Sequence, residues 1–346
     1  MKRRFGLAED VLPAKAVSDT ELKHSPTAGS PDVDITMLAW NRPDETIEAI
    51  ASALAQTGVR RHVFVVDQGS EPENLARLKA YCAGRSDVTL KCLDHNVGVA
   101  EGRNIAIALG SAPIIVGMDN DAVFPDGTTI ERAVRRLRED PLLGVIAFRI
   151  LDFDTKAEDH WDYPLALRNG AIESFEATRF LGGGQAIRRD VFEAVGGYDG
   201  ALFFIGEERD IAWRIINAGY RIKWFRDIAI LHHEHAGQKV TWTRRRYYFT
   251  VRNTLYINFK FGMPPLRLLR ATVAFLVRGA RNGLIGAAIE GTYASVGMMR
   301  RFAQTSTNKA AYRLSDDVRR YIRATDQEAT RSFVDRIRGL FTRLPG

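Results

Sequence analysis

Short apolar runs and helical patterns alternate along the chain from Asp34, and this alternation limits the possible folds more than any other feature. Strand and helix in regular alternation are typical of parallel sheets with crossover helices. The fold class is therefore α/β, with a mainly parallel central sheet flanked by helices. The predicted strands are Ile35–Ala39, His62–Val66, Val88–Leu93 and Ile114–Met118, and the predicted helices are Thr46–Leu54, Leu75–Tyr81 and Ala100–Leu109.

Polar residues follow three of these strands directly. In open sheets of this class, ligands collect at the carboxyl ends of the strands. Loops are polar in most proteins, so one such cluster alone would not indicate a site. Three clusters at one edge of the sheet favour a binding site, and they comprise Trp40, Asn41 and Arg42, then Asp67 with Gln68, Gly69 and Ser70, then Asp119, Asn120 and Asp121.

Asp119 and Asp121 follow a buried strand and supply two hard oxygen ligands close together. Mg²⁺ and Mn²⁺ are commonly held by one or two carboxylates, with substrate phosphates completing the coordination. A turn rich in aspartate is the alternative explanation. The position after Ile114–Met118 favours a metal site that binds a diphosphate substrate.

A second acidic cluster, Glu207, Glu208 and Asp210, precedes a helical pattern that ends at Gly219. Acidic residues in a first helical turn also stabilise the helix dipole, which is the structural alternative. Three carboxylates in four residues exceed what capping needs, and their repulsion raises the pKa of at least one of them. The cluster is a candidate general base.

These motifs together resemble the family 2 glycosyltransferases, which have the GT-A fold, over about residues 33–260. The nearest branch is the bacterial rhamnosyltransferase-like and polysaccharide-assembly group. The resemblance is carried by Asn41-Arg42, Asp67-x-Gly-Ser70, Asn96-x-Gly98, Arg103-Asn104, Asp119-x-Asp121, Gly182-Gly183-Gly184, Arg188-Arg189, Gly196-Gly197-Tyr198-Asp199, Glu207-Glu208-x-Asp210, Trp213-Arg214 and His232.

The resemblance implies a donor site for a nucleotide-diphosphate sugar, linked to UDP or dTDP. The residues implied to bind the donor are Trp40, Asn41, Arg42, Asp67, Asn96, Gly98, Arg103, Asn104 and Asn120.

It also implies a site for Mg²⁺ or Mn²⁺ at Asp119, Asp121 and His232, with Asp121 the preferred direct ligand. Beside His233 and His235, His232 is alternatively an ordinary loop histidine.

The general base in this family belongs to an acidic pair before a helix, which here is Glu207-Glu208. We expect Glu208 to be the base, with Glu207 as the second choice. The implied reaction is a single inverting displacement, in which the hydroxyl of a glycan or lipid-linked acceptor attacks the anomeric carbon. The acceptor side is expected at Trp161, Gly183, Gly184 and Asp210, because aromatic rings pack on sugars and glycines admit close approach. Each of these residues is alternatively part of the core or of a turn.

The last third of the chain is basic. Residues 240–346 hold 20 Lys and Arg against 6 Asp and Glu, a net charge of +14 within a chain of net charge +7. From Leu266 the spacing predicts an amphipathic helix with Arg267, Arg270, Arg278 and Arg281 on one side. We expect peripheral contact with an anionic membrane. The alternative is a helix packed on the catalytic domain with a solvated basic edge.

The domain organisation follows from these patterns. We expect a flexible leader at residues 1–31, a catalytic domain at 32–240 and a basic helical region at 241–346. Two cysteines without dense spacing, and no recognisable signal peptide, favour a cytoplasmic setting.

Two other functions use the same features. A sugar-1-phosphate nucleotidyltransferase would need similar carboxylates, but no glycine-rich start with Arg and Lys follows the first strand. A nucleic-acid-binding protein would use the basic tail and leave the acidic clusters unexplained. We therefore expect no specific nucleic-acid partner. The oligomeric state does not follow from the sequence.

Overall fold

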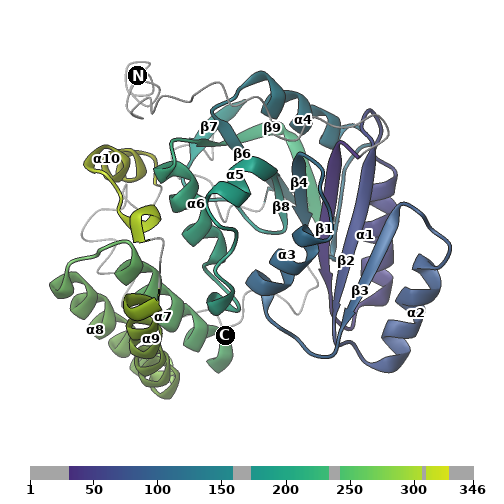
Figure 1. Ribbon diagram of the computed structural model, residues 1–346. Coiled ribbons are helices and arrows are strands. Elements are labelled where there is room, and N and C mark those ends of the chain that lie inside the picture. The colour runs from purple at the N-terminus through teal and green to yellow at the C-terminus, as the bar shows by residue number, and fades with distance from the viewer. Residues whose placement is uncertain (1–30, 159–172, 234–241, 306–308, 327–346) are drawn as a thin grey trace.

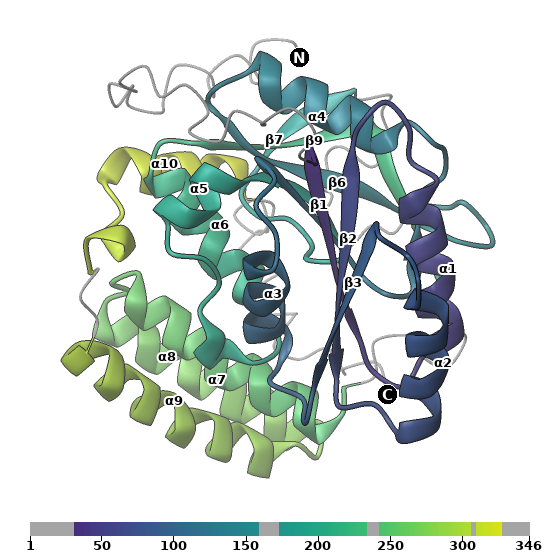
Figure 2. The ribbon, with the colours of Figure 1, turned by 45° about the vertical axis from the view of Figure 1, so that its right-hand side comes forward.

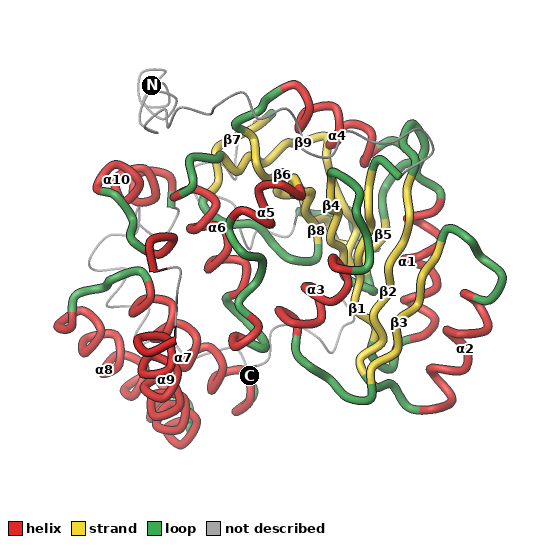
Figure 3. Tube along the Cα trace, in the orientation of Figure 1, coloured by secondary structure: helices red, strands yellow, loops and turns green. Residues whose placement is uncertain are grey.

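A nine-stranded sheet forms the centre of the part of the chain that the structure describes. The structure is a computed structural model that describes residues 31–158, 173–233, 242–305 and 309–326 (Figure 1). Figure 3 shows the strands as one layer with helices on both sides. Apart from residue 31, the expected leader lies outside the described residues.

The first half of the sheet is parallel and has the strand order β3-β2-β1-β4. All four strands were predicted from the apolar runs. Their bounds are β1 Val33–Ala39, β2 Arg61–Gln68, β3 Val88–Leu93 and β4 Ile114–Met118. The crossovers contain the three predicted helices, which are α1 Pro43–Leu54, α2 Pro72–Cys82 and α3 Val99–Ala108.

Beyond β4 the sheet becomes mixed, with the order β8-β6-β9-β5 and with β7 paired to β9. Strands β8, β5 and β7 run against their neighbours, so six of the nine described strands share one direction and the sheet is mostly parallel. The bounds are β5 Ala122–Val123, β6 Leu143–Asp152, β7 Ser174–Ala177, β8 Gly184–Arg188 and β9 Arg221–His232.

Two hydrophobic cores lie on opposite faces of this sheet, because successive side chains of a strand point to opposite faces. In β4, Ile114 and Val116 face one core and Ile115 faces the other. Helices α1 and α4 (Thr129–Glu139) cover the first face. Helices α3, α5 (Arg189–Ala194), α6 (Glu207–Asn217) and α10 (Asp316–Thr325) cover the second (Figure 2).

The C-terminal region is helical, as expected, and α7, α8 and α9 pack together beside α6 and α3 (Figures 1 and 2). Their bounds are α7 Arg244–Lys260, α8 Pro265–Arg281 and α9 Ile285–Thr305. After α9 the chain returns to the sheet, where Val318, Tyr321 and Ile322 of α10 join the second core. Among the described helices, none has the length and apolarity that crossing a membrane requires.

A buried ion cluster joins α7 to α6. The Lys260 ammonium lies 2.6 Å from Asp199 Oδ2 and 2.6 Å from Asp210 Oδ1. Arg214 lies one helical turn after Asp210 and its guanidinium is 2.7 Å from Asp210 Oδ2. Burial alone would raise the pKa of Asp210, but the charges of Lys260 and Arg214 lower it below its usual value. Lys260 and Arg214 therefore stabilise the charged form of Asp210 inside the protein. The same cluster fixes α7 to α6.

Lys260→Met is expected to destabilise the protein by about 3 kcal/mol, because removing one partner of a buried ion pair leaves the carboxylates uncompensated. Urea unfolding followed by circular dichroism measures the change. The matched control is Lys91→Met, which removes a lysine on an exposed strand position. Equal stability of the two variants would show that the cluster does not hold α7.

Candidate active site

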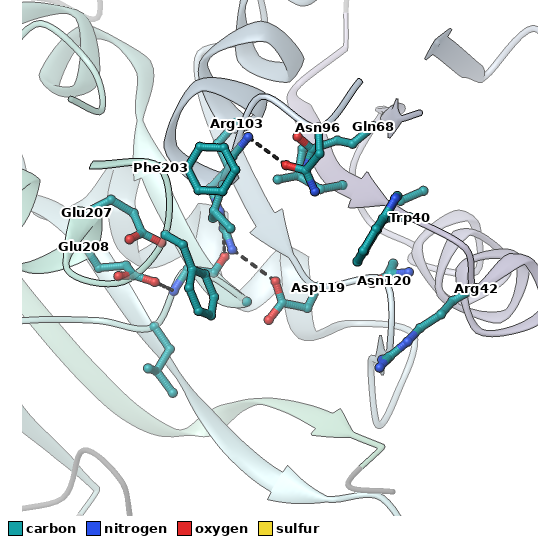
Figure 4. A pocket seen from close by; sticks show the side chains of 18 of the residues that line it. Trp40, Arg42, Gln68, Asn96, Arg103, Asp119, Asn120, Phe203, Glu207 and Glu208 are labelled. Carbon is teal, nitrogen blue, oxygen red and sulfur yellow. Dashed lines mark hydrogen bonds and ion pairs between the residues drawn. The ribbon is translucent and has the colours of Figure 1, made fainter. Parts of the chain in front are cut away.

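A cavity of about 550 Å³ opens at the carboxyl ends of β1, β2 and β4. Most of the residues predicted for the site line it, which confirms that the three polar clusters meet at one edge. From the donor set these are Trp40, Arg42, Asn96, Gly98, Arg103 and Asn120. From the metal, acceptor and base sets they are Asp119, His232, Gly183, Glu207 and Glu208. In Figure 4, Asp119 lies between the two glutamates on one side and Trp40 and Arg42 on the other.

Three potential metal ligands meet at this edge of the sheet. One ligand atom from each of Asp119, Asp121 and His232 lies within 4.8 Å of the others. The meeting depends on antiparallel pairing of β5 with β9, in which Ala122 is opposite His232. The backbone N–H of His233 also donates to the carbonyl of Asp121 at 2.9 Å. The sheet therefore brings together residues that are more than a hundred positions apart in the sequence.

The environment of Asp121 keeps its carboxylate ionised, as a metal ligand must be. Asp121 is 8% exposed, and burial alone would raise its pKa. The hydrogen bond and charge of His232, followed by the charge of Arg42, lower the pKa below its usual value. The relevant distances are 3.3 Å from His232 Nε2 to Oδ1 and 2.8 Å from Arg42 Nη1 to Oδ2. Two carboxylates and an imidazole with this geometry fit Mn²⁺, and with fewer protein ligands also Mg²⁺.

Arg103 positions the carboxylate of Asp119, and Gly183 leaves the space that this carboxylate occupies. Arg103 Nη2 lies 3.0 Å from Asp119 Oδ1, while Arg103 Nη1 donates to the carbonyl of Gly182. Burial would lower the pKa of Arg103, but Asp119 raises it above its usual value, so the guanidinium stays charged. A Cβ atom on Gly183 would lie 2.1 Å from Asp119 Oδ2. The position of this carboxylate therefore requires glycine at residue 183.

Glu207 and Glu208 begin α6 and reach the same cavity from its other side (Figure 4). Glu208 Oε1 accepts a hydrogen bond from the backbone N–H of Gly182 at 3.2 Å. Glu207 is 3% exposed. Burial, and after it the charge of Glu208, raises the pKa of Glu207 well above its usual value. Burial therefore disfavours the charged form of Glu207, whereas the Glu208 carboxylate lines the cavity and is oriented by the Gly182 N–H.

Some of the predicted donor residues do not reach the cavity but hold the loops that form it. Asp67 is fully buried and accepts from the backbone N–H groups of Gly69 and Ser70 and from the Ser70 hydroxyl. The Ser70 hydroxyl in turn accepts from the Asn41 N–H at 2.9 Å.

Asn104 makes two hydrogen bonds to the backbone of Tyr198, at 2.9 and 3.0 Å. Asn41, Asp67 and Asn104 thus support the loops around the cavity, and the donor contacts expected for them stay a prediction.

Two residues expected on the acceptor side, Asp210 and Gly184, do not line the cavity. Asp210 is fully buried and belongs to the ion cluster with Lys260 and Arg214. Gly184 lies inside β8, where a Cβ atom would be 2.9 Å from Ile150. Helix periodicity explains the first difference, since Asp210 lies two residues beyond Glu208 and points to the opposite side of α6. Trp161 lies outside the described residues.

The cavity is also lined by residues to which the sequence gave no role of their own, among them Gln68, Phe203, Phe204 and Arg245. Gln68 ends β2 and its side chain accepts from the Val97 N–H at 3.2 Å. Phe203, Phe204 and Arg245 form a wall next to Glu207 and Glu208. Arg245 belongs to α7, and its guanidinium lies 5.9 Å from the centre of the Phe203 ring. Arg245 stands in a basic run, and only its place in the fold distinguishes it from its neighbours.

Comparison with known proteins agrees with this site. Residues 34–196 match the family model described as Glycosyl transferase family 2. The chain is 25% identical over 249 residues to the pre-mycofactocin glycosyltransferase of Mycobacterium tuberculosis, which covers 68% of this chain and 50% of that protein. It is 40% identical over 106 residues to the succinoglycan biosynthesis protein ExoO of Rhizobium meliloti, 30% of each chain. The chain thus spans about half or less of the length of these relatives.

The fold is that of the GT-A glycosyltransferases. The mannosyltransferase PcManGT of Pyrobaculum calidifontis, solved in complex with GDP-Man and Mn²⁺, superposes with a TM-score of 0.53. The alignment covers 93% of this chain and 92% of that chain at 18% identity. The mixed α/β sheet and the helical C-terminal region thus have a counterpart among solved structures.

Asp121→Asn is expected to lower the affinity for Mn²⁺ at least about tenfold, since losing even an outer partner of a metal site costs that much. Electron paramagnetic resonance of free and bound Mn²⁺ measures the affinity. Asp154→Asn, on an exposed loop residue, is the control. Equal Mn²⁺ affinity in the two variants would exclude this cluster as the metal site.

Proposed function

We propose that this chain, whose residues 34–196 match the glycosyl transferase family 2 model, transfers a sugar from a nucleotide-diphosphate donor to an acceptor hydroxyl with inversion. The observation that carries the proposal is one cavity with two separate acidic clusters. The cluster of Asp119, Asp121 and His232 fits a divalent cation. Glu207 and Glu208 line the same cavity and include the proposed base.

The donor occupies the side of the cavity at β1, β2 and α3. Trp40 is 50% exposed at the cavity wall, and an exposed aromatic ring offers a stacking surface for a nucleobase. The proposed donors are UDP- and dTDP-sugars. Arg42 and Arg103 carry positive charge to the edge where the diphosphate would lie, and each is already positioned by an aspartate.

Asp119, Asp121 and His232 would hold a divalent cation, either Mg²⁺ or Mn²⁺. When bound, this cation would neutralise the charge that develops on the leaving diphosphate. The mannosyltransferase PcManGT, which shares the fold, was solved with Mn²⁺. This supports a metal-dependent reaction.

Glu208 is the proposed base. A general base must be ionised and within hydrogen-bond reach of the hydroxyl it deprotonates. Glu208 lines the cavity and is oriented by the N–H of Gly182, whereas burial raises the pKa of Glu207 and disfavours its charged form. The two neighbouring glutamates thus have different roles: Glu208 accepts the proton of the acceptor hydroxyl, and Glu207 does not.

The reaction proceeds in one displacement. The acceptor oxygen forms a bond to the anomeric carbon while its proton passes to Glu208. The bond from the anomeric carbon to the diphosphate oxygen breaks at the same time, and the nucleoside diphosphate leaves with the electron pair. Attack and departure occur on opposite faces, so the configuration is inverted and no sugar is attached to the protein.

The acceptor enters between Glu208, Gly183 and the wall of Phe203 and Phe204. Aromatic rings pack against the apolar faces of sugars. The name of the relative ExoO, a succinoglycan biosynthesis protein, supports a glycan or lipid-linked acceptor in cell-surface polysaccharide synthesis. The family match favours this reaction over nucleotidyl transfer, which the same carboxylates would otherwise allow.

Glu208→Gln is expected to lower the turnover number by about 10²- to 10⁴-fold, the usual contribution of a general base. Glu207→Gln is the matched control, because it makes the same change at the neighbouring glutamate, whose buried position disfavours the charged form that a base needs, and it should cost less than about tenfold. Release of nucleoside diphosphate from a panel of UDP- and dTDP-sugars with Mn²⁺, with Mg²⁺ and with chelator measures both variants. Equal losses would reject Glu208 as the base, and no metal-dependent release from any donor would reject the proposed function.

Arg245→Met is expected to raise the KM for the donor or acceptor about tenfold, because it removes the cation that α7 contributes to the cavity wall. Arg244→Met is the control, since Arg244 pairs with the exposed Glu290 of α9. Steady-state kinetics with both substrates varied identifies which one Arg245 contacts. Equal kinetics of the two variants would contradict a role for α7 in the site.

A further inference from the structure

Helix α8 presents a row of large apolar side chains to solvent. Leu266, Leu269, Val273 and Val277 are exposed to 59%, 58%, 50% and 40%. Their spacing of three or four residues places them within about 80° on one face of the helix. The opposite face packs on α7, where Tyr247 donates a hydrogen bond to the carbonyl of Phe275 at 2.8 Å.

Helix α9 has a similar row. Ile285, Ile289, Tyr293 and Val296 are exposed to 40%, 55%, 83% and 41%. They lie opposite the buried face of α9, on which Gly291 approaches the backbone of Tyr248 in α7. The two rows therefore both point away from α7. We call these eight residues of two adjacent helices the α8–α9 apolar face.

Positive charge accompanies the α8–α9 apolar face. Residues 265–305 contain six arginines and one glutamate. In α8, the angular positions of Arg267, Arg270, Arg278 and Arg281 form a band along one side of the apolar row. A surface that combines apolar side chains with adjacent arginines matches a layer in which apolar chains lie beneath phosphate groups.

We propose that the α8–α9 apolar face docks on an anionic phospholipid bilayer. The leucine, valine and isoleucine side chains reach below the headgroups, and the neighbouring arginines bind lipid phosphates. Tyr293, the most exposed of the eight, has the apolar ring and polar end that suit the interface itself. A second copy of this chain is a poorer occupant, because it would bring six more arginines to the same contact without phosphates to neutralise them.

Docking in this way affects the proposed site. Arg244 at the start of α7 lies close to Glu290 of α9, and the next residue, Arg245, lines the cavity. The apolar face and the cavity are thus connected through adjacent residues. Given the proposed function, a transferase docked in this way takes as its acceptor a glycan carried on a membrane lipid.

Vesicle flotation with the full chain tests the docking. We expect binding to vesicles of phosphatidylcholine with phosphatidylglycerol, weaker binding to phosphatidylcholine alone, and release by salt. Leu269→Ser with Val273→Ser and Ile289→Ser should lower the vesicle partition coefficient at least about tenfold, given the apolar area removed. Arg267→Gln with Arg270→Gln should lower binding to the anionic vesicles to a similar extent. Leu142→Ser is the control, since Leu142 is an exposed leucine on the sheet domain, 39% accessible.

Three results would overturn the proposal. These are unchanged flotation of the triple serine variant, equal binding of the native chain to neutral and anionic vesicles, or absence of vesicle binding. In the last case, sedimentation velocity compares the native chain with the triple serine variant. A dimer of the native chain that the variant does not form would identify a second copy as the occupant. Metal-dependent release of nucleoside diphosphate from the donor is measured in parallel without vesicles. If this release persists while docking fails, only the docking is rejected, and the reverse result rejects the proposed function alone.

Discussion

Carboxylates crowd one end of the sheet, and the arginines that balance them determine which elements must meet there. Asp121 is paired with Arg42 at the start of α1, and Asp119 with Arg103 of α3. Bringing several like charges into one cavity is unfavourable unless each is compensated or protonated. Glu207 is different, because burial and the charge of Glu208 raise its pKa and so disfavour a further negative charge. The arrangement thus lets Asp119, Glu207 and Glu208 line one cavity of about 550 Å³.

The order of elements along the sheet follows from the same requirement. The strand-end aspartates come from β4, but the histidine comes from β9 on the far side of β8 and β6. The two-residue strand β5 bridges this distance, because it follows Asp121 directly and pairs with the end of β9. Without that short antiparallel pairing, the sheet would not bring the ligand atom of His232 near those of Asp119 and Asp121.

The sequence predicted the first four strands, the three crossover helices and the edge at which polar residues gather, since these depend on local apolar periodicity. It did not predict which of these polar residues bond within the protein instead of lining the cavity. Asp67 and Asp121 both follow strands, yet Asp67 turns back to its own loop while Asp121 faces His232. That difference depends on hydrogen bonds to neighbouring segments. Arg245 illustrates the same limit, because its two arginine neighbours have an identical local pattern and only packing of α7 directs one of the three into the cavity.

The C-terminal helices contribute directly to the cavity wall. The family match ends at residue 196, whereas Glu207, Glu208, His232 and Arg245 all lie beyond it. Lys260 fixes α7 to Asp210 on the same helix that carries the two glutamates. Because α7 also packs against α8 and α9, it connects these outer helices to α6 through a buried ion pair. The matched region therefore supplies the cavity residues at the ends of β1, β2 and β4, while Glu207, Glu208 and Arg245 come from helices outside it.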